Sequence, residues 1–94
     1  MLTGIRHKSV LALGLVLIVM VTSACRPPTA FERGLDYAEQ GDYENAIEEY
    51  DEAIRLNPQD AMAYYVRGVI YETLGKSKEA ELDFAKAKEL GYDP

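Results

Sequence analysis

The sequence predicts an all-α fold of four antiparallel helices, arranged as two copies of one helical hairpin. Three observations lead to this prediction. Residues from about 27 to 94 repeat with a period of 34. Helix start and stop signals bracket four segments of this region, and no segment shows the apolar–polar alternation that is typical of a strand.

The repeat becomes visible when the chain is compared with itself at a shift of 34 residues. Small, basic and aromatic positions then fall on the same or a similar residue. The pairs are Arg33 with Arg67, Gly34 with Gly68, Leu35 with Val69, Tyr37 with Tyr71, Gly41 with Gly75, Ala46 with Ala80, Tyr50 with Phe84, Ala53 with Ala87 and Leu56 with Leu90. Such a pattern indicates one structural unit that is used twice.

Local signals place the first hairpin. Thr29 followed by Glu32 is a capping box, which opens a helix that should end at Gly41. Asp42 is a good N-cap for a second helix, which we expect to run to about Leu56.

The second hairpin is placed in the same way. We expect Asn57 to cap the third helix, with Pro58 at its first position, where a missing N–H costs nothing. That helix should reach Leu74 and stop at Gly75. The fourth helix is predicted over residues 77–90.

The segment from about residue 30 to residue 92 resembles the tetratricopeptide repeat. The signature residues are Gly34-x-x-Tyr37, Ala46-x-x-x-Tyr50 and Pro58 in the first copy, and Gly68-x-x-Tyr71 and Ala80-x-x-x-Phe84 in the second. The chain departs from the family pattern at its early tryptophan, its leucine and its second closing proline. Those places hold Ala30 and Tyr64, Arg33 and Arg67, and Tyr92. The resemblance implies a short α-solenoid of two helix-turn-helix repeats, about residues 27–60 and 61–94, that binds other proteins.

Small residues suggest how the helices approach one another. We expect Gly34 and Gly68 to face Ala46 and Ala80, so that the paired backbones come close. Four aromatic side chains should fill the space beside these contacts: Tyr37, Tyr50, Tyr71 and Phe84. The resemblance further implies that Ala53 and Ala87 pack toward a following helix, and only Ala53 has such a helix after it.

An arginine recurs in each copy with an acid sixteen residues after it. We predict that Arg33 pairs with Glu49, that Arg67 pairs with Asp83, and that each arginine lays its stem over the core. The alternative is two exposed arginines with no fixed partner.

The resemblance implies that the first helix of each repeat lines a groove for a peptide or a partner helix. The expected groove residues are spaced by three and four on each helix, and they are Phe31, Leu35, Ala38, Met62, Tyr65, Val69 and Glu72. This surface is apolar and nearly uncharged, without the lysine and asparagine that grip a terminal carboxylate in some relatives. We therefore expect an apolar ligand segment, held by Phe31, Leu35 and Tyr65. The alternative is that these residues are core.

Residues 1–24 have the composition of a secretory signal peptide. The basic Arg6 and Lys8 precede an uncharged run over residues 10–21, and small residues follow it. A retained transmembrane helix is the alternative, although it needs roughly 20 apolar residues.

The small residues lead into Cys25, and Ser23-Ala24-Cys25 resembles the lipobox of bacterial lipoproteins, with Thr22 in place of the usual aliphatic residue. The resemblance implies cleavage before Cys25, acylation of that residue with chains such as palmitate, and a short tether over residues 25–29. It also implies an extracytoplasmic location in the cell envelope. Arg26 stands where aspartate marks retention at the inner membrane, which favours the periplasmic face of the outer membrane in a cell with two membranes. An ordinary signal peptide with a stray thiol is the alternative.

Charge and composition exclude several functions. Removal of residues 1–24 leaves 8 basic against 16 acidic side chains, a net charge of −8, which opposes nucleic-acid binding. The repeats contain no histidine and only one serine, Ser77, so no nucleophile with a base can be assembled. We expect no enzyme, no catalytic residue, no cofactor and no metal site; weak calcium binding by the acids of residues 44–52 is the remaining alternative.

Two functions remain after these exclusions. The first is a lipid-anchored adaptor that binds an envelope protein. The second is a self-associating structural unit whose groove is an oligomer interface. The fourth helix has no further helix after it, so Leu82, Ala85 or Leu90 should stay partly uncovered unless a partner or a second copy covers them.

Overall fold

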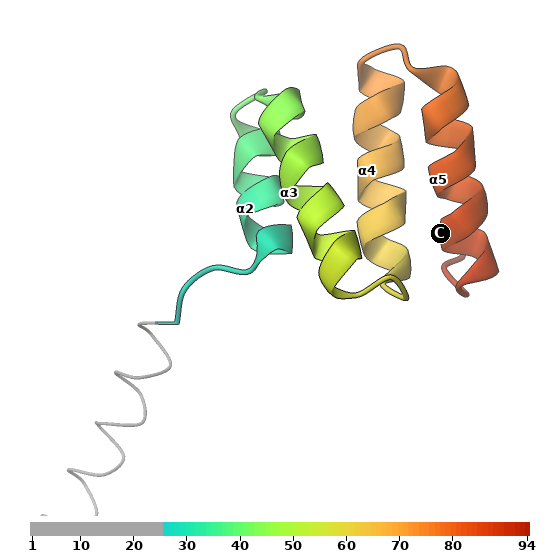
Figure 1. The fold of residues 1–94 in the computed structure, drawn as a ribbon. Coiled ribbons are helices and arrows are strands. Elements are labelled where there is room, and N and C mark those ends of the chain that lie inside the picture. The colour runs from blue at the N-terminus through green and yellow to red at the C-terminus, as the bar shows by residue number, and fades with distance from the viewer. Residues whose placement is uncertain (1–25) are drawn as a thin grey trace, which may run out of the picture.

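The computed structural model describes residues 26–94, which form four α-helices and, within that range, no strand. α2 spans Ala30–Glu39, α3 spans Tyr43–Leu56, α4 spans Ala61–Thr73 and α5 spans Ser77–Glu89. The helices run antiparallel in chain order (Figure 1), so the predicted fold class is confirmed. The expected signal peptide and Cys25 lie outside the described residues.

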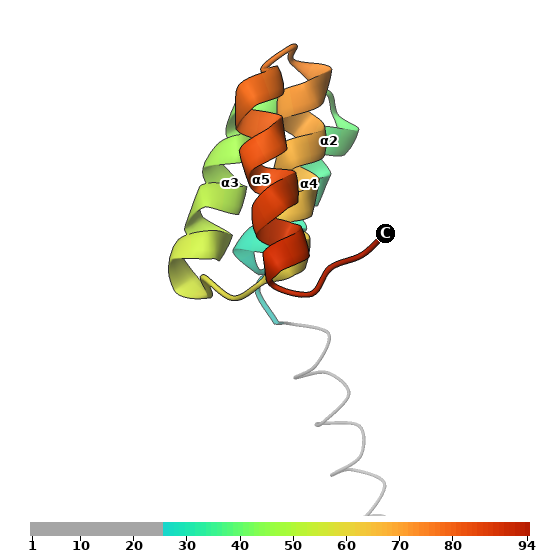
Figure 2. The ribbon, with the colours of Figure 1, turned by 90° about the vertical axis from the view of Figure 1, so that its right-hand side faces the viewer.

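The four helices form two hairpins that stand side by side. α2 packs on α3, α4 packs on α5, and a smaller contact between α3 and α4 joins the hairpins. Seen from the end, α2 and α4 lie on one side of the molecule and α3 and α5 on the other (Figure 2). Among residues 26–94, none of the helices is long and apolar enough to cross a bilayer.

The capping box at the start of α2 is present as predicted. Thr29 Oγ1 accepts a hydrogen bond from the Glu32 backbone N–H at 3.2 Å, and a Glu32 carboxylate oxygen accepts one from the Thr29 N–H at 2.7 Å. The bond from the Thr29 backbone, followed by those from Arg26 and the Thr29 side chain, holds the pKa of Glu32 at about 2. The start of the first repeat is therefore fixed by local chemistry.

A glycine lies in the turn of each hairpin, just after α2 and just after α4. Gly41 and Gly75 each have φ of 77°, a conformation that residues with a Cβ rarely adopt. Asp42 then caps α3 by accepting a hydrogen bond from the Asn45 N–H at 3.4 Å, as expected from the sequence. The two turns thus repeat the same geometry 34 residues apart.

The predicted start of the third helix is wrong by several residues. α4 begins at Ala61, and its N-cap is Asp60, whose Oδ1 accepts hydrogen bonds from the N–H groups of Met62 and Ala63. Asn57 instead follows the end of α3 and its side chain accepts a bond from the Gln59 N–H at 3.2 Å. Asn57 and Asp60 both have side chains that can cap a helix. The Asp60 side chain accepts hydrogen bonds from two backbone N–H groups and the Asn57 side chain accepts one, so the helix begins after Asp60.

The two hairpins share one apolar core. Six of its buried residues form two clusters, Ala30 with Ala53 and Ala63, and Ala46 with Tyr50 and Ile70. Ala63 and Ile70 come from α4, so the second repeat covers the inner face of the first. Ala87 is also buried, at 1% exposed, although within the described residues no further helix follows it.

Each hairpin closes on a contact between a glycine and an aromatic ring. A Cβ placed on Gly34 would lie 2.8 Å from Tyr50 Cζ, and one on Gly68 would lie 2.8 Å from Phe84 Cε1. Real Cβ atoms essentially never come so close, so a side chain at either glycine would push the ring out of place. The ring, the glycine and the interhelical spacing are therefore set together.

We expected Gly34 and Gly68 to face Ala46 and Ala80, and the structure shows that the group nearest to each glycine is an aromatic ring. The three atoms nearest to a Cβ at Gly34 all belong to Tyr50, while Ala46 lies in the core cluster with Tyr50 and Ile70. The physical reason is size, because the space left by a missing side chain is filled by the larger group.

The hydroxyl of Tyr50 is a buried side-chain group without a hydrogen-bond partner in the described part of the chain. The side chain is 0% exposed, and within residues 26–94 its oxygen has no hydrogen-bond partner. Burial raises the pKa of Tyr50 to about 12, because the phenolate form loses its hydration. The second repeat has no such buried hydroxyl, since its equivalent residue is Phe84.

We predict that Tyr50→Phe stabilises the protein by about 1 kcal/mol, because a buried donor without a partner is removed. The thermal midpoint should rise by about 4–8 °C in circular dichroism. Since the folded pKa lies above the ordinary value of 10.0, the wild type should lose stability between pH 10 and 12, and the variant should lose less there. Tyr37→Phe, at a half-buried tyrosine, is the control and should leave the midpoint unchanged. A lower midpoint for Tyr50→Phe would show that the hydroxyl is hydrogen-bonded.

Candidate interaction surface

The side formed by α2 and α4 carries the seven residues that we expected in the groove. Four of them are exposed: Leu35 at 39%, Met62 at 41%, Val69 at 41%, and Glu72. The other three, Phe31, Ala38 and Tyr65, are half-buried. The seven residues thus divide into four that are exposed to solvent and three that are partly covered by the rest of the domain.

Phe31 and Ala38 pack against the core from α2. The Phe31 ring meets the Tyr50 ring edge to face with centroids 5.3 Å apart, and Ala38 packs on the cluster around Tyr50. These two residues accordingly follow the alternative that we left open, in which part of the expected groove is core. Leu35, Met62 and Val69 remain as the apolar side chains that a partner can reach.

Tyr65 lies between two aromatic rings. Its centroid is 5.5 Å from that of Phe84 and 4.5 Å from that of Tyr92. Tyr92 follows Gly91, whose φ of 98° turns the chain after α5, and its N–H donates to the Ala87 carbonyl at 2.9 Å. The end of the chain therefore covers part of the expected surface, and the departure from the family pattern at residue 92 was the sequence signal for it.

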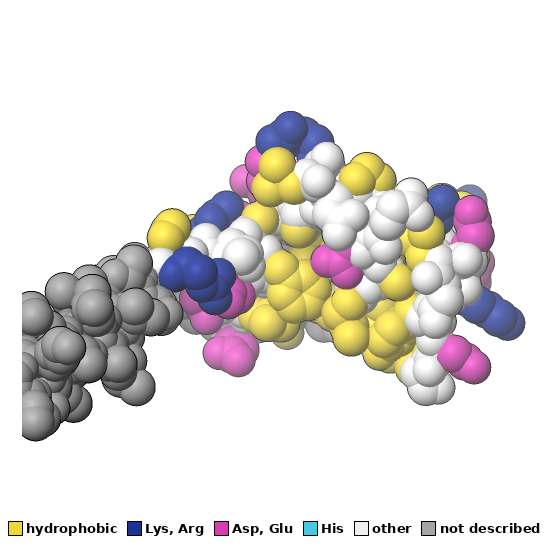
Figure 3. Space-filling model, turned by 90° about the horizontal axis from the view of Figure 1, so that it is seen from below, with side chains coloured by type: hydrophobic (Ala, Val, Ile, Leu, Met, Phe, Trp, Pro, Cys, Tyr) yellow, Lys and Arg dark blue, Asp and Glu magenta, His cyan; other side chains and the backbone are white. Residues whose placement is uncertain are grey.

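A hollow of about 250 Å³ opens at the end of the molecule where α2 begins and α3 ends. It is lined by Thr29, Ala30, Phe31, Ala53, Leu56 and Asp60. Leu56 is 65% exposed beside it. Figure 3, which looks at this end, shows hydrophobic side chains gathered in the centre of the view with charged side chains around them. We did not expect this hollow, because it depends on where α4 starts.

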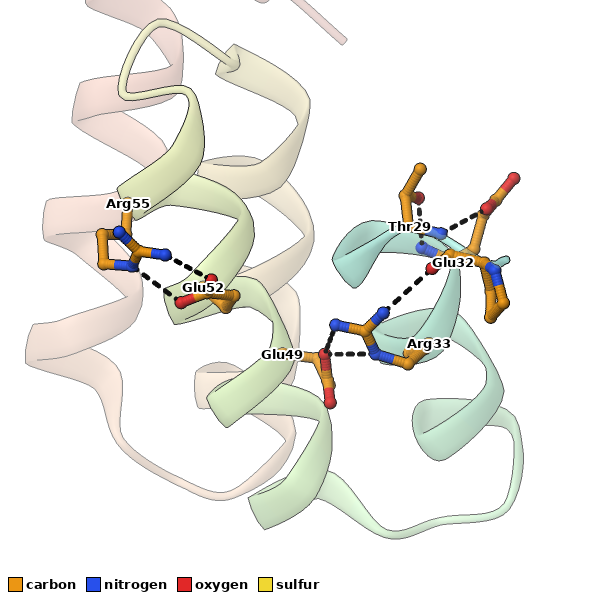
Figure 4. Close-up of polar contacts among 7 residues, drawn as sticks. Thr29, Glu32, Arg33, Glu49, Glu52 and Arg55 are labelled. Carbon is orange, nitrogen blue, oxygen red and sulfur yellow. Dashed lines mark hydrogen bonds and ion pairs between the residues drawn. The ribbon is translucent and has the colours of Figure 1, made fainter. Parts of the chain in front are cut away.

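The two predicted arginine pairs are both present. Arg33 Nε and Nη2 each lie 2.8 Å from Glu49 Oε2, and Arg33 Nη1 donates to the Pro28 carbonyl at 2.9 Å (Figure 4). Arg67 is bidentate on Asp83, with Nε and Nη2 at 2.8 and 2.7 Å from its two oxygens. Each arginine thus ties the first helix of its repeat to the second.

Arg67 makes a further bond that links the two repeats. Its Nη1 lies 2.7 Å from Asp51 Oδ1 on α3, and its guanidinium lies 5.8 Å from the ring centroids of Tyr64 and Tyr71. The bond to Asp83, and then that to Asp51, raises the pKa of Arg67. Nothing in the repeat pattern singled out Asp51, since its equivalent in the second copy is Ala85.

Two hairpins whose helix contacts recur after 34 residues define the class of helical-repeat proteins. A family model described as TPR repeat matches residues 34–75, and one described as Tetratricopeptide repeat matches residues 61–90. The chain is therefore a tetratricopeptide repeat protein, and its repeats form a protein–protein interaction module.

Similar sequences occur inside much longer proteins. The chain is 42% identical over 59 residues to the Hsp70-Hsp90 organizing protein of Triticum aestivum, which covers 63% of this chain and 10% of that protein. It is 40% identical over 58 residues to the Photosystem I assembly protein Ycf3 of Acaryochloris marina, covering 60% of this chain and 35% of that protein. A third similar protein is the UDP-N-acetylglucosamine--peptide N-acetylglucosaminyltransferase of Giardia intestinalis, at 43% over 56 residues, 57% of this chain and 4% of that protein. The chain thus spans between 4% and 35% of the length of these relatives.

The two arginine pairs allow a matched test, because they occupy equivalent places with different burial. The side chains of Arg67 and Asp83 are 19% and 7% exposed, against 42% and 22% for Arg33 and Glu49. We predict that Asp83→Ala lowers the free energy of unfolding by about 2–3 kcal/mol, because it leaves a partly buried guanidinium with Asp51 alone. Glu49→Ala should cost less than about 1 kcal/mol. Urea denaturation measures both, and equal losses would contradict the role assigned to burial.

Proposed function

We propose that this chain is a lipid-anchored adaptor of a bacterial cell envelope, which holds an apolar segment of another protein against the side formed by α2 and α4. The observation that carries the proposal is the set of three exposed apolar residues there: Leu35, Met62 and Val69. Large apolar side chains at this exposure, on the ligand-facing helices of an interaction module, favour a partner that covers them. The names of two relatives, an organizing protein and an assembly protein, fit an adaptor role.

The proposed anchor is supported by the order of residues before Cys25 and by the tether after it. Arg26 pairs with Glu32 at 2.9 Å, and the Pro28 carbonyl accepts the bond from Arg33. Thr29 is held by the capping box. A tether that is tied to α2 in this way would keep the domain close to an acylated Cys25, and so close to the membrane, on the extracytoplasmic side.

The proposal includes no catalytic role. Residues 26–94 contain no histidine and no cysteine, and in that range no three potential ligands come together around a site for a metal ion. The proposal therefore assigns no covalent catalysis by a histidine-activated nucleophile or by a cysteine to residues 26–94.

Self-association is the second candidate, and Leu82 on α5 favours it because its side chain is 72% exposed. The junction between the repeats argues against end-to-end stacking of copies. There, Ile70 and Leu74 of α4 pack on the core cluster of α3, whereas their equivalents on the outer face of α2 are Asp36 and Gln40. An end face that carries a carboxylate where the junction is apolar is a poor base for another repeat.

The anchor is tested by Cys25→Ala in the native host. We expect the wild type to fractionate with membranes and to carry the added mass of acyl chains at a new N-terminus, and the variant to lose both. A wild-type chain that is soluble and unmodified would support an ordinary cleaved signal. A variant that stays in membranes as firmly as the wild type would support a retained transmembrane helix.

The adaptor role is tested with a photo-crosslinking amino acid placed singly at Leu35, Met62 or Val69, and at Glu48 on α3 as the control position. We expect one discrete adduct with another protein from position 69 in cells, and none from position 48, because only the α2 and α4 side holds the partner. An adduct with twice the mass of the chain would support self-association instead. Absence of any adduct from positions 35, 62 and 69 would remove the proposed surface.

A further inference from the structure

The acids beside the exposed apolar residues of α2 and α4 point to the charge of the partner. Glu39 follows Leu35 by four residues and Glu72 follows Val69 by three, so each acid shares a helical face with its apolar neighbour. Both glutamates are exposed. Within residues 26–94 neither has an ion-pair partner.

No basic side chain on these two helices is left to balance them. α2 and α4 carry one arginine each. Arg33 is held by Glu49 and the Pro28 carbonyl, and Arg67 by Asp83 and Asp51. Three of the four lysines of residues 26–94 lie in α5, on the other side of the molecule (Figure 2). The fourth, Lys76, lies in the turn after α4 with its Nζ 6.0 Å from the ring centroid of Tyr71, and it forms no ion pair with Glu72.

Asp60 extends the negative charge to the start of α4. Its side chain caps the helix beside Met62, which is the third exposed apolar residue, and it also lines the hollow at that end. Each of the three apolar side chains therefore has a carboxylate within four residues along the chain. The side formed by α2 and α4 therefore carries acids close in sequence to its exposed apolar side chains.

We propose that the partner segment is amphipathic, with apolar side chains that cover Leu35, Met62 and Val69 and with lysine or arginine side chains that face Glu39, Asp60 and Glu72. This inference rests on the proposed function and adds the sign of the partner's charge. An acidic segment, or a segment read through its terminal carboxylate, would meet like charge on this surface. A basic segment gains attraction, which falls as salt screens it.

The test uses the full chain in an uncharged detergent and two fluorescent amphipathic peptides of about 18 residues, or roughly five helical turns. The peptides share one leucine face and differ only in a polar face of lysine or of glutamate. Fluorescence anisotropy, with detergent alone as the blank, gives each affinity. We expect the lysine peptide to bind and the glutamate peptide to bind at least about ten-fold more weakly, with the difference shrinking at high salt.

Charge reversal locates the effect. Glu39→Lys with Glu72→Lys should weaken the lysine peptide by about ten-fold and strengthen the glutamate peptide. Glu44→Lys with Glu48→Lys makes the same change of charge on α3 and should change either affinity by less than about two-fold. Val69→Asp should weaken the lysine peptide despite its added negative charge, because apolar contact is lost. Circular dichroism checks that each variant folds.

The outcomes separate this inference from the proposed function. If both peptides bind equally and Val69→Asp weakens both, the apolar surface stands and the charge preference is overturned. If the α3 pair weakens the lysine peptide as much as the α2 and α4 pair does, the attraction belongs to the whole acidic domain and the inference fails. If neither peptide binds while crosslinking from position 69 finds a partner, the class of partner is wrong but the adaptor role remains.

Discussion

The close approach of each glycine on a first helix to an aromatic ring on the second is the contact on which the rest of the structure depends. Tyr50 can lie at 0% exposure only because Gly34 has no side chain, and Phe84 lies against Gly68 in the same way. The ring positions then fix the distance within each hairpin, and the buried ring of Tyr50 offers Ile70 of α4 its apolar contact. The residues of α2 and α4 that do not take part in this packing remain exposed on the side that these two helices form.

Features that depend on neighbours in the chain could be predicted from the sequence. The capping box at Thr29 and the glycine turns at Gly41 and Gly75 are local motifs. The pairing of each arginine with an acid sixteen residues later could be predicted because the same spacing occurs in both repeats. The start of α4 could not be predicted in this way, because two nearby residues are equally good capping residues. Asn57 and Asp60 are both capping residues, and the two N–H groups that Asp60 accepts decide where α4 begins. The Arg67 bond to Asp51 and the cover of Tyr65 by Tyr92 were missed for a related reason, since each occurs in one repeat only.

The candidate surface shows the same division. Spacing placed seven residues on the α2 and α4 side, but spacing carries no information on how deep each lies. Phe31 and Tyr65 are large enough to reach neighbouring rings and became packing residues, whereas Leu35, Met62 and Val69 stayed outside. The acidic character of the surface follows from the predicted arginine pairs, which the structure confirms, together with the exposure of Glu39 and Glu72, which spacing alone does not give.

The bond between Arg67 and Asp51 has a consequence for growth of the array by duplication. A third copy of the hairpin would bring its own arginine to the outer face of α5, where Ala85 stands in place of the aspartate. Its first helix would also compete with Tyr92 for the ring of Tyr65. An engineered longer solenoid therefore needs an acid restored at residue 85 and the Asn-Pro of residues 57 and 58 copied to residues 91 and 92 before further units can dock.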